Sequence, residues 1–79
     1  MPNEEVVKAI RAFLQKQYMP FIKAKSIDRL VMTDRKELIL NIPNVTTEQL
    51  EEVLKEMDNA GYITDDNGIL ITFRLLFIL

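Results

Sequence analysis

The clearest pattern in the chain lies between residues 45 and 60, where apolar residues recur at the spacing of an amphipathic helix. The positions that share one stripe of a 3.6-residue helix are Leu50, Val53, Leu54, Met57 and Ala60. Thr46 and Gln49 form a Thr-x-x-Gln capping box at its start. Gly61 stands where a left-handed residue ends a helix. The pattern therefore predicts a helix over residues 46–60.

Directly after this helix come two short apolar, β-branched runs, at residues 62–64 and 69–73. They flank Asp65-Asp66-Asn67-Gly68. Asn-Gly between two such runs is a strong hairpin signal, because both residues tolerate positive φ. The sequence predicts a β-hairpin with its turn at residues 65–68.

A second amphipathic pattern opens the chain. Its apolar stripe consists of Val6, Val7, Ile10, Phe13, Leu14 and Tyr18. Asn3 is placed to act as the N-cap, and Glu4 and Glu5 follow at the positive end of the helix. Pro20 biases the residue before it away from helical geometry. We therefore expect the helix to end near Tyr18.

The middle of the chain, residues 21–44, fits two interpretations. In the one that we favour, part of residues 21–27 is a strand and a capping box at residues 34–37 opens a short helix. Leu38, Ile39 and Ile42 then pack inward, and a turn leads into the next helix.

The competing interpretation makes residues 29–33 and 37–42 two strands joined by a turn. It depends on the alternation of Leu38, Leu40 and Ile42, which is typical of a strand. The chain would then run helix-hairpin-helix-hairpin. Both interpretations give a single small α+β domain over residues 1–79.

The segment T-D-R-K-E-L-I-L-N-I-P-N-V-T-T-E-Q-L-E-E-V-L, followed by the predicted hairpin, resembles the winged helix-turn-helix superfamily over residues 33–73. The resemblance implies a winged-helix-like domain in a superfamily known mostly for DNA-binding regulators, with a minority that bind proteins. Such proteins usually read bases with polar and basic residues on the exposed side of the second motif helix. Here those positions hold Thr47, Glu48, Glu51, Glu52 and Lys55.

The net charge of −2 conceals a division along the chain. Residues 1–36 hold eight Lys and Arg against four acids, a net of +4, whereas residues 37–79 hold two bases against eight acids, a net of −6. DNA binding depends on Lys and Arg that displace counterions from phosphates, so an acidic helix is repelled from a groove. The resemblance implies a regulator in transcription or replication, and the acidic helix leads us to expect that it acts through protein contacts. Its partner-binding candidates are Glu48, Glu51, Glu52, Lys55 and Glu56.

The alternative is a homodimeric DNA-binding regulator that uses the basic N-terminal half. Its candidate contacts are Lys8, Arg11, Lys16, Lys23, Lys25, Arg29, Arg35 and Lys36. The two hypotheses differ in whether these basic side chains gather on one face of the fold, because scattered charges cannot follow a phosphate track.

Catalytic and metal chemistry finds little support in the composition. The chain has no His and no Cys, and Ser26 is its only serine. Two glycines cannot form a phosphate-binding loop. We expect no enzyme activity, no metal and no cofactor. Charged residues interrupt the N-terminal apolar stripe and no apolar run approaches the ~20 residues of a membrane helix. A cytoplasmic protein without membrane contact is the resulting expectation.

The end of the chain is strongly apolar. A strand here would be apolar on both faces and would need a cover, either from the chain's own core or from another chain. The candidate dimer interface consists of Leu75, Leu76, Phe77, Ile78 and Leu79.

Overall fold

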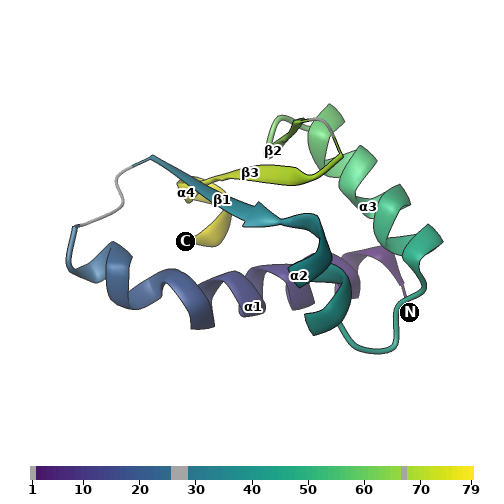
Figure 1. Ribbon diagram of the computed structural model, residues 1–79, viewed down its shortest axis with the longest axis horizontal. Helices are drawn as coiled ribbons and strands as arrows, with labels where there is room; N and C mark the ends of the chain where they lie inside the picture. The colour runs from purple at the N-terminus through teal and green to yellow at the C-terminus, as the bar shows by residue number, and fades with distance from the viewer. Residues whose placement is uncertain (1, 26–28, 67) are drawn as a thin grey trace.

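The computed structural model describes residues 2–25, 29–66 and 68–79, which form one mixed α+β domain (Figure 1). Within these ranges the helices and strands are α1 (Asn3–Lys23), β1 (Leu30–Asp34), α2 (Arg35–Asn41), α3 (Thr47–Asn59), β2 (Ile63–Asp66), β3 (Leu70–Arg74) and α4 (Leu75–Ile78). The sheet is antiparallel, and β3 lies between β1 and β2. In Figure 1, α1 runs along one side of the sheet and α3 stands beside the β2–β3 hairpin.

The helix predicted over residues 46–60 is confirmed as α3. Its N-cap is Thr46, whose hydroxyl accepts a hydrogen bond from the Gln49 amide at 3.1 Å. Gly61 adopts a φ of 84°, and the Tyr62 amide then donates to the Met57 carbonyl at 3.0 Å. This is the bond by which a left-handed residue closes the last turn of a helix. The predicted stripe is buried except for Ala60 at the C-cap, which is exposed.

The predicted hairpin is confirmed as β2 and β3, but its turn is not at residues 65–68: Asp65 and Asp66 belong to β2, where they pair with Ile71 and Leu70. Ile63 pairs with Phe73, and both side chains are buried. Gly68 has a φ of 68°, the conformation for which glycine is suited in a tight turn. Asn67, the other residue of the Asn-Gly signal, lies outside the described residues.

Helix α1 is longer than predicted, because it continues through Pro20 to Lys23. Proline removes one amide donor, but Pro20 is exposed, so water can reach the carbonyl that loses its partner. The last turn is held by the Ala24 amide, which donates to the Pro20 carbonyl at 3.1 Å, and by Ile22, which packs against the core. The prediction of Asn3 as N-cap is wrong as well: Pro2 takes that position.

The middle of the chain combines the two interpretations. Strand β1 falls close to the first strand of the competing interpretation, whereas α2 is the short helix of the favoured one. Residues 21–23 belong to α1, which contradicts a strand there, and residues 26–28 lie outside the described ranges.

Helix and strand patterns are hard to separate over residues 38–42, because Leu38 and Ile42 point inward in both. The prediction that Ile39 also packs inward is wrong, since its side chain is exposed. Leu40 distinguishes the two patterns: in α2 it lies on the outer side, with 79% of its surface exposed. Asp34 begins this helix by accepting a hydrogen bond from the Lys36 amide at 2.8 Å. The Asp34 side chain therefore caps the amide of Lys36 and not that of Glu37, as the predicted capping box would require. The competing prediction of a strand over residues 37–42 is wrong.

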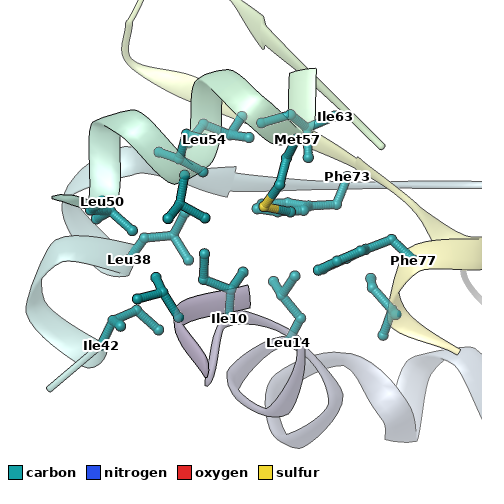
Figure 2. Close-up of a cluster of buried hydrophobic side chains, with 14 of the residues drawn as sticks. Ile10, Leu14, Leu38, Ile42, Leu50, Leu54, Met57, Ile63, Phe73 and Phe77 are labelled. Atoms are coloured by element: carbon teal, nitrogen blue, oxygen red, sulfur yellow. The ribbon is translucent and has the colours of Figure 1, made fainter. Parts of the chain in front are cut away.

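One face of the sheet packs on the helices and the other faces outward. The buried inner-face residues are Val31, Thr33, Ile63, Ile71 and Phe73. Figure 2 shows how α1, α2, α3 and α4 add their side chains to this core, among them Leu14, Leu38 and Phe77. The outer face exposes Leu30, Met32, Thr64 and Arg74.

Candidate functional site

The proposed partner-binding residues lie together on the exposed side of α3. Residues Glu48, Glu51, Glu52, Lys55 and Glu56 are all exposed. They lie opposite the buried stripe of α3, which packs against the sheet and α1. Counting Asp58, the helix carries five acids and one base, a net charge of −4.

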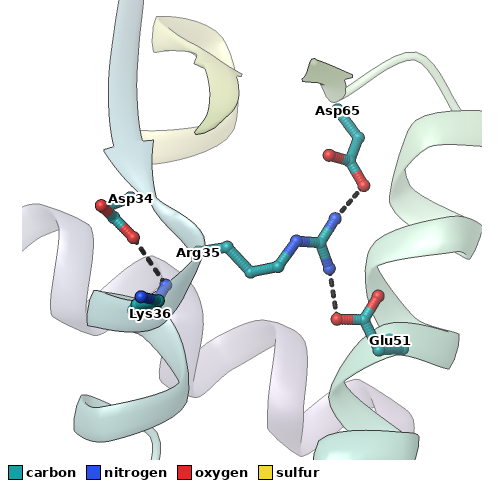
Figure 3. A network of polar contacts seen from close by, with 5 residues as sticks. All are labelled: Asp34, Arg35, Lys36, Glu51 and Asp65. Carbon is teal, nitrogen blue, oxygen red and sulfur yellow. Dashed lines mark hydrogen bonds and ion pairs between the residues drawn. The ribbon is translucent and has the colours of Figure 1, made fainter. Parts of the chain in front are cut away.

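Glu51 is exposed yet paired, and its partner is Arg35. Figure 3 shows the Arg35 side chain extending from the start of α2 between α3 and β2. One terminal nitrogen of its guanidinium binds Glu51 and the other binds Asp65. The Arg35 side chain is only 13% exposed to solvent, whereas the side chains of Glu51 and Asp65 are 47% and 28% exposed. We call this three-residue contact the arginine clamp.

The arginine clamp fixes the charge of Arg35. Burial by itself lowers the pKa of the guanidinium, but the hydrogen bonds and charges of Asp65 and Glu51 outweigh it and raise the pKa above its usual value. Arg35 is therefore a partly buried structural cation that ties α2, α3 and the hairpin together. In this arrangement it is not free to contact phosphate, which removes it from the proposed DNA-binding set.

A second polar contact joins the start of α1 to the acidic side of α3. The Asn3 side-chain amide donates to Glu56 at 3.2 Å and to Glu52 at 3.5 Å. The Gln49 side chain in turn donates to the Asn3 oxygen at 3.5 Å. An amide is neutral, so these bonds position the carboxylates without cancelling their charge.

Not all of the proposed DNA-binding residues are available to a ligand. Arg11 is committed inside the fold: its Nε donates to the Phe77 carbonyl at 2.8 Å, and its guanidinium lies 4.7 Å from the centre of the Phe77 ring. Of the others, only Lys8, Lys16 and Lys23 share a side of α1, within roughly 80° of arc at 3.6 residues per turn.

Lys25, Arg29 and Lys36 lie on separate segments. Lys25 follows α1, Arg29 precedes β1, and Lys36 belongs to α2 at the other end of β1. All three are exposed. Thus the structure brings together three of the eight proposed DNA-binding residues and places two of the eight in internal contacts.

The apolar C-terminus forms the short helix α4 and not a strand. Phe77 and Ile78 are buried in the chain's own core, where the Phe77 ring lies 5.9 Å from that of Phe73. The Gln15 side chain holds the end of α4 by donating to the Ile78 carbonyl at 2.7 Å. Two of the five candidate dimer-interface residues are therefore covered within the chain.

The remaining three leucines help to line a groove of about 530 Å³ on the outer side of the sheet. We call it the outer groove, and its lining residues are Arg29, Leu30, Thr64, Thr72, Arg74, Leu75, Leu76 and Leu79. Sequence reasoning singled out Leu75, Leu76 and Leu79 as a dimer interface and Arg29 as a DNA contact, but it did not single out Leu30, Thr64, Thr72 or Arg74. The alternation within residues 30–34 and 70–74 could have assigned Leu30, Thr72 and Arg74 to a common side.

A second groove of about 620 Å³ lies between α1 and α2. Its lining residues are Ala9, Ala12, Phe13, Lys16, Gln17 and Asn41. Neither groove is lined by a carboxylate, a His or a Cys. Over the described part of the chain, no three Asp or Glu side chains gather as metal ligands would.

Within the same ranges, no helix combines the length and apolar character needed to cross a membrane. No protein-family model, curated protein or solved structure matches the chain.

Proposed function

We propose that the chain is a winged-helix-like binding module that recognises a protein partner through the acidic side of α3, as a small regulator acting in transcription or replication. The order of elements supports a winged helix: a helix and a strand precede two helices joined by a turn, and a hairpin follows. The sheet order β1-β3-β2, in which the hairpin pairs with β1, is compatible with this interpretation, and in it α2 and α3 would be the helix-turn-helix pair. Residues 42–46 form the turn between them.

The charge of α3 is the observation that carries the proposal. In a DNA-binding helix-turn-helix, the second helix enters the major groove and meets phosphates on both sides. Here that helix has a net charge of −4, and Arg35, the cation that pairs with its Glu51, is also bound to Asp65. Such a surface suits a partner that presents Lys and Arg, because complementary charges steer association and select the partner.

The fold also holds this surface in place before any partner arrives. The arginine clamp fixes Glu51 relative to the hairpin, and Asn3 fixes Glu52 and Glu56 relative to α1. Side chains that are already ordered lose less conformational entropy on binding. The lining of the two grooves, which lacks acid–base groups other than Lys16, agrees with binding instead of catalysis.

The test reverses the charge of two exposed acids that lie outside the arginine clamp. Glu48→Lys with Glu52→Lys should abolish capture of the partner by cross-linking and mass spectrometry, while far-ultraviolet circular dichroism stays unchanged. The same variant should bind duplex DNA more tightly than wild type. Its log–log salt slope should steepen by up to about 1.8, since each added cation can displace close to one counterion.

The matched control makes the same charge change elsewhere, with Glu5→Lys and Glu37→Lys on α1 and α2. Both side chains are exposed and lie outside α3. If the control loses the partner as completely as the α3 variant, only net charge matters and the α3 surface is not the site.

A DNA-binding homodimer is the second candidate, and the lysines on the outer side of α1 favour it. Lys8, Lys16 and Lys23 extend over roughly 22 Å of helix at 1.5 Å per residue, enough to follow a phosphate backbone. This candidate predicts tight, sequence-selective binding by wild type in fluorescence anisotropy, weakened in a salt-dependent manner by Lys16→Ala. Weak binding without sequence preference at physiological salt would exclude it.

A further inference from the structure

The outer groove forms because the chain turns directly from β3 into α4. Arg74 is the register partner of Leu30 across the sheet, and α4 begins at the next residue. The Leu75 amide donates to the Arg29 carbonyl at 2.8 Å, which continues the β1–β3 pairing into the first residue of α4. The leucines of α4 are thereby placed at the end of the sheet's outer face, beside Leu30.

Large apolar side chains are left uncovered along this surface. Leu76 and Leu79 keep 84% and 66% of their surface exposed, and Leu30 keeps 56%. Scattered exposed leucines are ordinary on protein surfaces, but these three line one concave site. A contiguous apolar groove of this kind marks a binding surface for a partner.

The short helix α4, which forms one side of the groove, is held in place by contacts with α1. Arg11 and Gln15 of α1 donate hydrogen bonds to the backbone carbonyls of Phe77 and Ile78. The side chains of Phe77 and Ile78 are buried in the core. A partner would therefore meet a preformed surface and not a loose C-terminal tail. Binding to a preformed surface avoids most of the entropy cost of ordering it.

Two arginines determine which partner fits. Arg29 and Arg74 line the groove, both are exposed, and neither forms an ion pair with any residue in the described ranges. A second copy of the chain docking by the same surface across a two-fold axis would bring four guanidinium groups together over an apolar contact. Like charges at an interface oppose association, so the charge pattern calls for carboxylates on the partner.

We propose that the outer groove binds a short acidic, leucine-rich segment of a partner protein. Its apolar side chains pack against Leu30, Leu76 and Leu79, and its carboxylates pair with Arg29 and Arg74. This site lies on a different face from α3 and so goes beyond the function proposed above. The domain would then hold two partners of opposite charge, a basic one on α3 and an acidic one on the sheet.

The test selects displayed random peptides of about 12 residues, long enough for three helical turns, against the whole chain. Recovered peptides should carry Asp or Glu beside Leu, Ile or Phe. In fluorescence anisotropy with labelled peptide, Arg74→Glu should weaken binding by about tenfold or more, as the loss of a charge-assisted hydrogen bond requires. Leu76→Ser should weaken it as well, and it should leave the fold intact because Leu76 is exposed.

The charge swap sharpens the test. Selection against the Arg29→Glu, Arg74→Glu variant should recover peptides with Lys or Arg in place of the acids. Lys36→Glu makes the same kind of charge change at the opposite end of β1 and should leave peptide binding unchanged. Glu48→Lys with Glu52→Lys should also leave it unchanged, so failure of the α3 proposal and failure of this one are separable.

Three results would overturn the proposal. The first is a selection that yields no peptides, or peptides insensitive to Arg74→Glu and Leu76→Ser. The second is a wild-type dimer in light scattering that Leu76→Ser dissociates, because a second copy would then fill the groove. The third is Leu76-dependent sedimentation with vesicles of roughly three parts phosphatidylcholine to one part phosphatidylserine, which would make the occupant a lipid surface.

Discussion

Replacing Arg35 with methionine removes the arginine clamp but keeps most of the aliphatic bulk at the start of α2. Breaking a fully buried ion pair costs about 3–5 kcal/mol, whereas an exposed pair contributes less than about 1 kcal/mol. The clamp lies between these limits, because Arg35 is 13% exposed and its partners are 47% and 28% exposed. The Nε atom of Arg35 is also buried and has no hydrogen-bond partner among the described residues. The methionine removes this unpaired donor, which offsets part of the loss. We therefore expect Arg35→Met to lower the free energy of unfolding by about 2 kcal/mol.

Urea denaturation followed by circular dichroism measures this loss, and Lys36→Met is the matched control. Lys36 is the next residue, is exposed and loses the same charge, so its replacement should change the free energy of unfolding by less than about 0.5 kcal/mol. A double-mutant cycle with Glu51→Gln should give a coupling energy of about 1 kcal/mol. In a domain of this size, the Arg35 variant should melt roughly 8–16 °C lower than wild type.

The pH dependence has a defined sign. Because the folded chain raises the pKa of Arg35, the contribution of the guanidinium is fully present below the unfolded-state pKa. This contribution to stability is lost only as the pH rises through the higher pKa that Arg35 has in the folded chain. The difference between wild type and Arg35→Met should therefore stay constant from neutral to moderately alkaline pH. Equal stability of Arg35→Met and Lys36→Met, or zero coupling with Glu51→Gln, would refute the structural role of the clamp.

Two further predictions concern the helices. Thr46→Ala should cost about 1 kcal/mol in urea denaturation, because the Gln49 amide loses its cap, and Thr47→Ala, just inside the helix, is its control. Leu38→Ala should cost about 2–5 kcal/mol as a core truncation, whereas Leu40→Ala should cost less than about 0.5 kcal/mol, and similar losses at both positions would contradict the helical assignment of α2.

The sequence was sufficient wherever local signals agreed with one another. Helix α3 has a cap at Thr46, a stripe of period 3.6 and a left-handed Gly61, and each of these acts within a few residues. The β2–β3 hairpin likewise follows from a turn signal between two β-branched runs. In such segments the local preferences and the packed fold favour the same structure.

Local signals failed where packing at a distance decided the outcome. Pro20 predicts a helix end, but the packing of Ile22 and the exposure of the proline keep α1 intact for another turn. At α2, the positions of Leu38 and Ile42 fit both a helix and a strand, and the Asp34 cap and the outward Leu40 decide between them.

The candidate sites show the same limit more strongly. Glu51 and Asp65 lie 16 and 30 residues from Arg35, so no spacing rule could pair them. Arg11 and Phe77 are 66 residues apart in the sequence. Arg11 was predicted to contact DNA, but in the fold its side chain binds the backbone of α4. Charge alone predicted a basic N-terminal half, but only the fold decides which cations remain available to a partner.

The fold separates part of the charge that the sequence divides between its two halves. Five of the eight acids of residues 37–79 lie on α3, where Glu51 binds Arg35. Of the two bases in that half, Arg74 lies instead on the outer face of the sheet, beside Leu30 and close to Arg29. An opposite arrangement, with these arginines on α3, would suit DNA. The arginines lie instead next to exposed leucines while α3 carries the acids, and this arrangement is the basis of the two proposed protein partners of opposite charge.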